Sequence, residues 1–467
     1  MPRSGPVQQV WSLLREGLRG SNRDFTQGPV GHAVLVLAIP MVMEMSMESL
    51  FAVVDVFFVS KLGATAVATV GLTESMLTIV YSVAMALCIG ATATVARRIG
   101  EKDAEGASIA AVQVLAVGLL VSVVLGIAGS LNARWLLAKM GADADVLGPS
   151  ATFSVIMLGG SGSVMMLFLM NAIFRAAGDA TIAMRVLWLA NAINLALDPC
   201  LIFGLGPFPE LGVVGAAVAT TTGRSTAVVI QLALLFSGRR RIAVAARHLK
   251  LVPAAMWTVC RLSGTGLLQI LISTSSWIGL VRVISMFGSP ALAGYTIGIR
   301  TILFALLPSW GLANAAATMV GQGLGAGKPE RAEQAVWTAC FYNLAFLGAI
   351  GALFVVFTPA IVGIYTSDPE IARYAAACLR IVSFGFVFYA FGMVLTQSFN
   401  GAGDTWTPTW INIGCFWLWE IPLAWLLALH LGFGPTGVYI AVTIAFSTVA
   451  VVSAVLFRRG RWKVKRV

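Results

Sequence analysis

Phe174-Arg-Ala-Ala-Gly-Asp179 recurs as Phe399-Asn-Gly-Ala-Gly-Asp404, at an offset of 225 in the numbering. At the same offset, Val95-Ala-Arg-Arg-Ile-Gly100 faces Val320-Gly-Gln-Gly-Leu-Gly325. Apolar stretches resemble one another by chance, but a constant register through two Gly-Asp turns is hard to obtain by accident. We therefore expect two similar halves built on one plan of elements.

The composition places both halves in a membrane. Of the 467 residues, 58% are hydrophobic and only 11% are charged, and the mean hydropathy is +0.88. Soluble domains carry about a quarter charged residues, so this chain could not cover a water-facing surface. Apolar runs of roughly 20 residues predict transmembrane helices. Twelve such runs are found, at about 33–59, 66–96, 107–130, 147–174, 181–206, 212–237, 254–286, 292–320, 332–358, 371–399, 407–432 and 436–458.

The basic residues indicate the orientation. With the N-terminus inside, 22 Lys and Arg fall on the inner side and four on the outer side, which predicts that both termini are cytoplasmic. The net charge of +11 is thus spread over short loops and the chain ends. It does not form one nucleic-acid-binding face.

The runs and the repeat together predict an all-α polytopic membrane protein of twelve transmembrane helices. Six spans per half give both halves one orientation, so their pseudo-two-fold axis should follow the membrane normal, as in parallel-repeat transporters. The predicted parts are a cytoplasmic tail at 1–32, a six-helix bundle at 33–237, a basic linker at 238–253, a second bundle at 254–458 and a basic tail at 459–467. Within the first tail, Val7–Leu18 is weakly amphipathic and is expected to lie on the membrane surface, with a frayed tail as the alternative.

Catalytic and metal chemistry have little support in this sequence. The six cysteines all lie in apolar runs, without a C-x-x-C pair, and the three histidines are scattered. We find no nucleophile paired with a base, so an enzyme is not expected, and neither is a cofactor.

Acidic residues inside spans ask for an explanation, because a charge at a helix centre costs about 2.5–3.5 kcal/mol on insertion scales. The first span carries Glu44, Glu48 and Asp55 within an arc of roughly 40° and over about 16 Å. The fifth span carries Asn191, Asn194 and Asp198 within roughly 60°. Pro40 precedes the acidic face of the first span and predicts a kink there, either a hinge or a static bend. Two further charged residues of this half are Glu74, near the outer end of the second span, and Arg224 in the sixth.

The constant offset between the halves supplies an internal control. Every one of these acids is replaced in the second half: Gln269, Ser273, Leu280, Ile299 and Leu423 stand at the positions equivalent to Glu44, Glu48, Asp55, Glu74 and Asp198. Acids needed merely to build a six-helix bundle should recur in both bundles. We infer that the acids serve a task of the first half.

Facing carboxylates can bind H⁺ or Na⁺, and the bound ion changes the cost of burying the site. Asp55 and Asp198 are the candidate coupling residues, with Asn191 and Asn194 as supporting ligands and Na⁺ as a candidate metal at Asp55, Asp198 and Asn194. Alternatively, the two aspartates bond helix ends or pair with Arg224. Glu44 and Glu48 could instead line a substrate cavity, as could Arg224. Glu74 is expected near the outer interface, where a charge is ordinary.

The second half has its own unusual residues. Arg282 and Arg300 are expected to reach the outer surface, whereas Glu420 could pair with an arginine or meet a cationic cargo. Trp419 belongs to an aromatic group with Phe416, Trp417 and Trp425. Such rings can bind aromatic cations in a cavity, and they can equally pack or anchor in lipid.

These features resemble the multidrug and toxic compound extrusion (MATE) transporters. The resemblance rests on the first span ending in Val54-Asp-Val-Phe-Phe-Val59, the two Gly-Asp turns, and Asn194…Asp198-Pro199 followed by Gly212-Val-Val-Gly-Ala-Ala217. It covers about 30–460. It implies a V-shaped protein with a central cavity in the bacterial inner membrane. Such a protein exports cationic or amphipathic compounds in exchange for H⁺ or Na⁺.

One branch of that family, related to the DNA-damage-inducible exporters, has a cation site in its first half. The resemblance matches that site to Asp55, Asn194 and Asp198. A second branch has acidic ligands in spans 7 and 10. This sequence has no Asp or Glu in span 7, and it has none in span 10 beyond the first turn. A monomer is expected.

The competing interpretation is a lipid-linked oligosaccharide flippase of the same superfamily. Such a flippase would favour an arginine-rich cavity and more than twelve spans, whereas the acids here favour an exporter.

Overall fold

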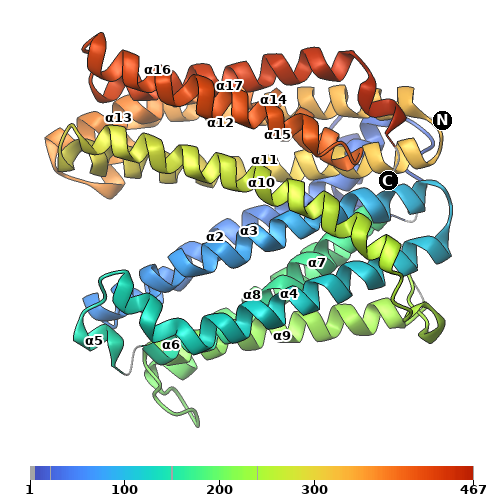
Figure 1. Ribbon diagram of the computed structural model, residues 1–467, viewed down its shortest axis with the longest axis horizontal. Helices are drawn as coiled ribbons and strands as arrows, with labels where there is room; N and C mark the ends of the chain where they lie inside the picture. The colour runs from blue at the N-terminus through green and yellow to red at the C-terminus, as the bar shows by residue number, and fades with distance from the viewer. Residues whose placement is uncertain (1–5, 22, 149–150, 239, 466–467) are drawn as a thin grey trace. The chain divides into compact units, whose positions relative to one another are not determined.

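The computed structural model describes residues 6–21, 23–148, 151–238 and 240–465, and over these residues it contains helices and connecting loops but no β-strand (Figure 1). The helices are α1 Pro6–Arg19, α2 Val30–Ser60, α3 Ala64–Gly100, α4 Ala104–Lys139, α5 Ala144–Leu147, α6 Ala151–Gly159, α7 Ser161–Ala177, α8 Ala180–Phe203, α9 Val213–Phe236, η1 Ala246–His248, α10 Pro253–Ser285, α11 Ser289–Gly325, α12 Pro329–Tyr365, α13 Pro369–Phe384, α14 Phe386–Gly401, α15 Trp406–Asn412, η2 Ile413–Glu420, α16 Ile421–Trp425, η3 Leu426–His430, α17 Pro435–Arg458 and η4 Arg461–Val464.

Eleven helical segments of the described chain are long and apolar enough to cross a membrane, and twelve if one bent pair counts as a span. The bent pair is α13 with α14, which meet at 59° beside Gly385. The number of spans therefore agrees with the sequence-based prediction. Hydropathy did not predict the bend at Gly385 or the interruption at Gly160, which separates α6 from α7. Both breaks lie inside continuous apolar runs, where hydropathy has no contrast to detect.

The described chain divides into two compact units. The N-unit comprises Glu16–Asn22 and Met43–Gly264, and the C-unit comprises Met1–Arg15, Arg23–Val42 and Thr265–Val467. Helices α2 and α10 are each divided between the units, after Val42 and after Gly264. This division by packing differs from the repeat-based bundles 33–237 and 254–458, which stay a prediction.

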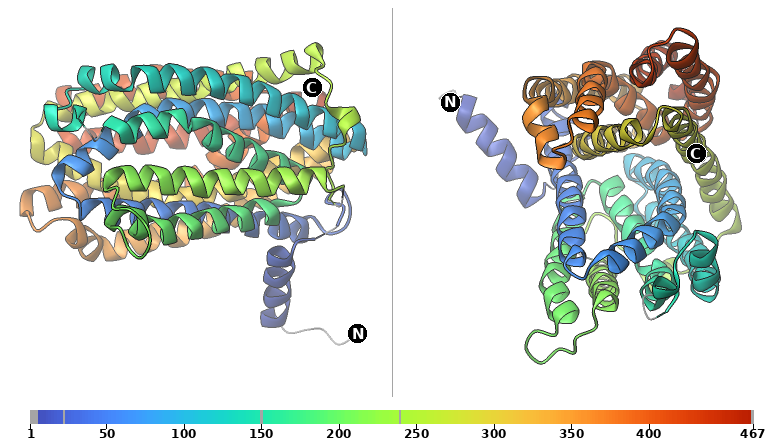
Figure 2. Two further views of the ribbon diagram at one scale, coloured as in Figure 1. Left: turned by 90° about the horizontal axis from the view of Figure 1, so that it is seen from below. Right: turned by 90° about the vertical axis from the view of Figure 1, so that its left-hand side faces the viewer.

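In the N-unit, α3 packs against α4 and α7, and α8 packs against α9. Figure 2 shows α8 and α9 side by side with the loop that joins them. Small residues permit this approach: a Cβ on Gly223 of α9 would lie 2.7 Å from the carbonyl oxygen of Ala190 on α8. The interior is built from aliphatic side chains and alanines, with Phe174 fully buried.

The C-unit is more aromatic. Its core surrounds Tyr295, Phe386, Tyr389 and Tyr439 from α11, α14 and α17, and the rings of Tyr295 and Tyr439 stack with centroids 6.3 Å apart. Helices α11, α12, α13, α14 and α17 pack around this core. The segment from α15 to η3 includes two stretches of π-helix, η2 and η3. π-Helical turns are rare and are frequent at functional sites.

The helix bounds follow the offset seen in the sequence. Adding 225 to both bounds of α3 gives both bounds of α11, and adding it to the last residue of α2 gives the last residue of α10. The Gly-Asp turns also correspond, since Gly178 and Gly403 both have positive φ, the left-handed conformation that ends a helix. The two halves thus share helix ends as well as sequence.

A basic residue contacts the aspartate of each Gly-Asp turn. The carboxylate of Asp179 lies 3.7 Å from Arg241 Nε, and that of Asp404 lies 3.2 Å from Lys465 Nζ. Asp404 also accepts a hydrogen bond from Thr407. In each unit this pair ties the turn to the segment that follows the last helix.

Helix α1 confirms the helical prediction for Val7–Leu18. Its C-terminal end belongs to the N-unit, where Thr181 and Arg185 of α8 donate to the carbonyls of Gly17 and Leu18. The placement of α1 on a membrane surface stays a prediction.

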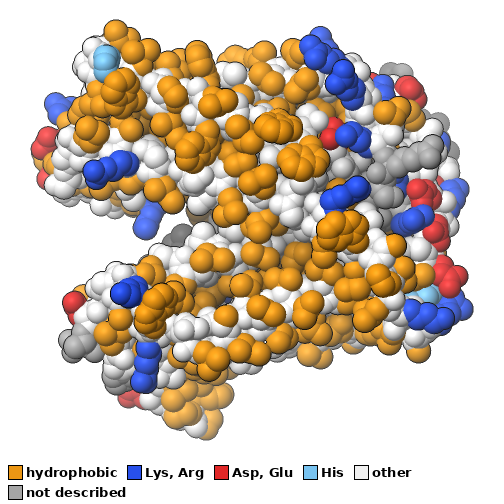
Figure 3. Space-filling model, viewed as in Figure 1, with side chains coloured by type: hydrophobic (Ala, Val, Ile, Leu, Met, Phe, Trp, Pro, Cys, Tyr) orange, Lys and Arg blue, Asp and Glu red, His pale blue; other side chains and the backbone are white. Residues whose placement is uncertain are grey.

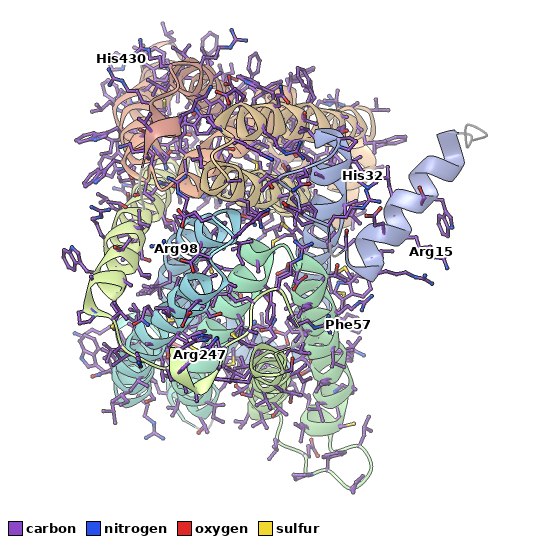
Figure 4. All side chains as sticks on the ribbon, turned by 90° about the vertical axis from the view of Figure 1, so that its right-hand side faces the viewer. Arg15, His32, Phe57, Arg98, Arg247 and His430 are labelled. Carbon is purple, nitrogen blue, oxygen red and sulfur yellow. The ribbon has the colours of Figure 1, made fainter. Side chains whose placement is uncertain are left out.

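Hydrophobic and basic side chains occupy different parts of the surface along the helices. On the face shown in Figure 3, hydrophobic side chains cover the flanks of each unit, and Lys and Arg gather toward helix ends. Arg98 and Arg247 lie on one end of the N-unit, which faces the viewer in Figure 4. Both approach the turn after α3: Arg98 pairs with Glu101 and Arg247 lies 3.9 Å from Glu105. Arg282 and Arg300 are exposed, and their place at the outer surface stays a prediction.

Candidate functional site

The polar residues of α8 face the interior of the N-unit. Asn191, Asn194 and Asp198 are all buried, and Asp198 exposes 1% of its surface. Their spacing of three and four residues places them on one face of the helix. The close packing of α8 on α9 brings Thr220 within hydrogen-bond distance of Asn194.

The amide of Asn194 connects Asp198 to Thr220. With its nitrogen toward Asp198, it donates to Oδ2 at 2.7 Å, and its oxygen accepts from Thr220 N and Oγ1, each at 2.9 Å. The opposite orientation would turn the amide oxygen toward an acceptor and the amide nitrogen toward the Thr220 donors. The first orientation is therefore the one that satisfies all partners.

Asp55 of α2 and Asp198 of α8 lie within electrostatic range of each other in the N-unit. Each has one buried carboxylate oxygen without a hydrogen-bond partner, Oδ1 in both residues, and the amide nitrogen of Asn191 is also buried without a partner. Such groups are costly in a low-dielectric interior unless a ligand or proton completes them. The two acids that the sequence singled out thus lie in the same unit and within electrostatic range of each other.

Arg224 does not neutralise this pair by direct contact. Among the described residues it forms no ion pair within 4.0 Å with Asp55 or Asp198, although it lies within electrostatic range of Asp55 and Glu48. Its guanidinium carbon lies 6.0 Å from the ring centroid of Tyr81. The structure therefore does not contain the alternative arrangement, in which the aspartates form a close ion pair with Arg224.

Glu44 has a partner that the sequence did not predict. The side chain is fully buried, and its Oε1 lies 2.5 Å from Arg175 Nη1 of α7. The span prediction ended at 174 and counted Arg175 as a loop residue, whereas α7 continues to Ala177. Glu48 is half-buried one turn away on α2, and Glu74 is exposed on α3.

The equivalent contact in the C-unit is neutral. Gln269 and Asn400 are the repeat equivalents of Glu44 and Arg175, and Asn400 Nδ2 donates to Gln269 Oε1 at 3.1 Å. Both halves therefore join the same two helices by a buried polar contact at one position. The signal was present in the sequence, since both partners lose their charge together.

Glu420 lies inside the C-unit and not beside an arginine. It exposes 2% of its surface and bonds to Ser276 of α10. Of the two alternatives for Glu420, an arginine partner or a cationic cargo, the first does not hold among the described residues, where Glu420 forms no ion pair. Trp417, Trp419 and Trp425 are half-exposed, whereas Phe416 is buried. Trp419 lines a pocket of about 520 Å³ between η2 and α17 within the C-unit.

Two of the supporting residues near Asp198 turn a nitrogen and not an oxygen toward the site. A sodium site requires oxygen ligands, but Asn194 turns its nitrogen to Asp198 and its oxygen to Thr220. The buried atom of Asn191 that lacks a partner is likewise a nitrogen. In the described part of the chain, no cluster of three or more His, Cys, Asp or Glu could hold a metal ion.

A family model described as MatE matches residues 40–200 and 265–426. The chain belongs to the MatE family. The two matched segments begin at residues 40 and 265, which is the same offset as that of the repeat. This MatE chain is a multi-pass membrane protein and a transporter, not an enzyme.

Relatives and solved structures agree with the family. A protein of Thermotoga maritima named "Probable multidrug resistance protein NorM" is 25% identical over 93% of each chain. The "FAD transporter" of Shewanella oneidensis is 25% identical over 85% of this chain and 88% of its own. A structure described as the outward-facing conformation of a multidrug resistance MATE family transporter superposes with a TM-score of 0.87 at 26% identity, covering 95% of this chain and 98% of its own. A transporter of the MOP superfamily from Pyrococcus furiosus, whose title reports reverse polarity of its binding pocket, gives the same values.

In the sequence of this MatE chain, the acidic residues stood out because they lie within apolar runs. Their hydrogen-bond partners did not stand out. Tyr81, Thr220 and Ser276 are ordinary residues of apolar spans and carry no signal of their own. The partner of Glu44 was not predicted either, although the repeat carried a signal for it in the joint change to Gln269 and Asn400.

Proposed function

We propose that this chain is a proton-driven antiporter that exports cationic or amphipathic organic compounds from the bacterial cytoplasm. In this proposal both termini lie on the cytoplasmic side of the inner membrane. The observation that carries the proposal is the pair Asp55 and Asp198, which lie within electrostatic range of each other and each have one buried oxygen without a hydrogen-bond partner. The names of several relatives, which refer to multidrug resistance, support this class of cargo.

The physical basis is the cost of the charged pair. Two carboxylates that share a buried site cannot both stay charged without penalty, and one proton removes both the like-charge repulsion and part of the desolvation cost. A proton taken up at Asp55 or Asp198 therefore favours the conformation in which the site is sealed. Loss of that proton favours a conformation in which solvent or a cation reaches the carboxylates.

Asn194 holds Asp198 in position for this exchange. Its nitrogen donates to one oxygen of Asp198 while its oxygen is held by Thr220, so the other carboxylate oxygen stays available to a proton. We propose H⁺ and not Na⁺ as the coupling ion because these amide nitrogens offer no ligand to a metal. Glu44 is not part of the proposed coupling site, because its carboxylate forms an ion pair with Arg175.

The test is transport of ethidium into everted vesicles or proteoliposomes under separately imposed pH and Na⁺ gradients. We expect transport with the pH gradient alone, and its loss in both Asp55→Asn and Asp198→Asn while the proteins remain folded in the membrane. Glu210→Gln, which removes an exposed acid from the α8–α9 loop, is the matched control and should transport normally.

Normal transport by both aspartate variants would exclude this coupling site. Transport driven only by Na⁺ would exclude the proton. No transport under either gradient, with correctly folded protein, would redirect the assay to lipid-linked substrates and the flippase alternative.

A further inference from the structure

Glu420 is a buried acid that the proposed coupling site does not use. It ends the π-helical stretch η2 in the C-unit, and its Oε2 lies 2.8 Å from Ser276 Oγ of α10. Its other oxygen, Oε1, is buried without a hydrogen-bond partner. A carboxyl group in a membrane span with a single hydroxyl neighbour requires an explanation.

Counting hydrogens at Ser276 indicates which form of Glu420 this geometry suits. Ser276 Oγ lies within hydrogen-bond distance of two acceptors, Glu420 Oε2 at 2.8 Å and the carbonyl oxygen of Phe416 at 3.2 Å. A serine hydroxyl has one hydrogen, so it can serve both acceptors only by sharing that hydrogen in a weaker three-centre bond. If Glu420 is protonated, it donates to Ser276 Oγ, and Ser276 donates to Phe416. The neutral acid thus satisfies both contacts.

In the described part of the chain, no basic side chain pairs with Glu420. The titratable groups within its electrostatic range include the phenols of Tyr295 on α11 and Tyr389 on α14 and the thiol of Cys415 on its own helix. Both tyrosines are buried. No Lys, Arg or His of the described chain forms an ion pair with Glu420. A carboxylate buried among phenols and apolar groups is costly, and a proton removes that cost.

The repeat relates Glu420 to the site in the N-unit. Glu420 is equivalent to Leu195, and Asp198 is equivalent to Leu423, so the two acids lie three residues apart on equivalent spans, about 4.5 Å along the axis. Ser276 is equivalent to Phe51, one turn from Asp55 on the equivalent of the first span. Each half therefore has a buried acid on its fifth span, facing a polar residue of its first span, with the two acids displaced by about one turn.

We propose that Glu420 is a second proton-binding site of this transporter, located in the C-terminal half and held by Ser276. The proton resides on Glu420 Oε2 and exchanges with solvent when the C-unit opens toward water. This inference deepens the proposed function by adding a second exchangeable proton, and it was not expected from the loss of the five acids in the second half.

The test is infrared spectroscopy of the purified full-length protein in lipid, titrated with pH. The C=O stretch of a protonated carboxyl group is resolved from amide and carboxylate bands. We expect a component that titrates reversibly in the wild type, that is absent from Glu420→Gln, and that shifts in frequency in Ser276→Ala because its hydrogen bond is lost. Glu210→Gln, an exposed acid, is the matched control and should leave the component unchanged.

The spectra also separate this proposal from the coupling site of the N-unit. Asp55→Asn and Asp198→Asn should each retain the Glu420 component. If Glu420→Gln gave the wild-type spectrum at every pH, or if its component were present but never titrated, the second site would be overturned while the N-unit site stood. If the component titrated as expected but the aspartate variants transported normally, the N-unit site would fall and Glu420 would stand.

A transport measurement checks the consequence. In proteoliposomes, the number of protons exchanged per ethidium is obtained from the pH gradient that just balances an imposed ethidium gradient. We expect Glu420→Gln to retain transport with about one proton fewer per ethidium. An unchanged ratio would contradict an exchangeable proton on Glu420.

Discussion

At the scale of single residues, Glu44 and Arg175 offer a direct comparison between a charged and a neutral version of one contact. Removing one partner of a buried ion pair leaves an unbalanced charge and typically costs roughly 3–5 kcal/mol, whereas replacing both partners can be nearly neutral. The C-unit already contains the neutral version in Gln269 and Asn400.

We therefore predict that Glu44→Gln strongly lowers the thermal stability of the purified protein and that Glu44→Gln/Arg175→Asn restores most of it. The double variant copies the pair found at the equivalent positions of the second half. Thermal unfolding in detergent, followed by tryptophan fluorescence, measures both. A double variant that is less stable than the single one would show that the charges themselves hold α2 to α7.

Asp179 predicts a pH dependence. Burial raises the pKa of the Asp179 carboxyl above its ordinary value of 3.8, and Arg241 opposes that rise. The folded state therefore holds this proton more tightly than the unfolded state, so the stabilisation is complete below about pH 3.8 and is lost as the pH rises through the folded pKa.

As the pH rises from below 3.8, the melting temperature of the wild type should accordingly fall relative to that of Asp179→Asn. Comparison with the variant cancels the titration of other groups. The contact with Arg241 that the variant also loses contributes an offset. A difference that grew in favour of the wild type with rising pH would mean that Arg241 outweighs burial.

At the scale of elements, helix contacts depend on positions without a side chain. A Cβ on Gly401, at the end of α14, would lie 2.2 Å from the carbonyl oxygen of Ala317 on α11. A Cβ on Gly348 of α12 would have no neighbouring atom within 4 Å.

We predict that Gly401→Ala destabilises the protein by about 1–3 kcal/mol through overpacking. Gly348→Ala should be neutral or stabilise by up to about 1 kcal/mol, since alanine is the better helix former. Denaturation of the two variants under identical detergent conditions measures the contrast. Equal effects would indicate that α11 and α14 separate without cost.

The elements also show what a sequence can predict. Hydrophobic runs predicted the spans because each span must satisfy its backbone internally and face lipid. They did not predict the breaks at Gly160 and Gly385 or the π-helical turns before Glu420, because these depend on packing and leave the apolar run unbroken. Asp55 and Asp198 were recognised because a charge stands out in an apolar run. The orientation of Asn194 depends on Thr220 of another helix, which no local pattern encodes.

At the scale of the whole molecule, the distribution of basic residues predicts an orientation in the membrane. We predict that Lys61 lies outside and Arg247 inside, from the excess of basic residues on the inner side. In a variant without the six native cysteines, a membrane-impermeant maleimide should label Lys61→Cys in intact spheroplasts and Arg247→Cys only after permeabilisation. Both side chains are exposed, so a lack of labelling reports sidedness and not burial. The reverse pattern would invert the topology.

The exchange of Glu44–Arg175 for Gln269–Asn400 has a consequence for descent by duplication. If both halves come from one ancestral six-helix unit, two substitutions separated the copies at this contact, and either substitution alone would have buried an uncompensated charge. The route between the two versions therefore passes through an unfavourable intermediate. Among relatives we expect each half to carry either the charged pair or the neutral pair, and mixed pairs to be rare.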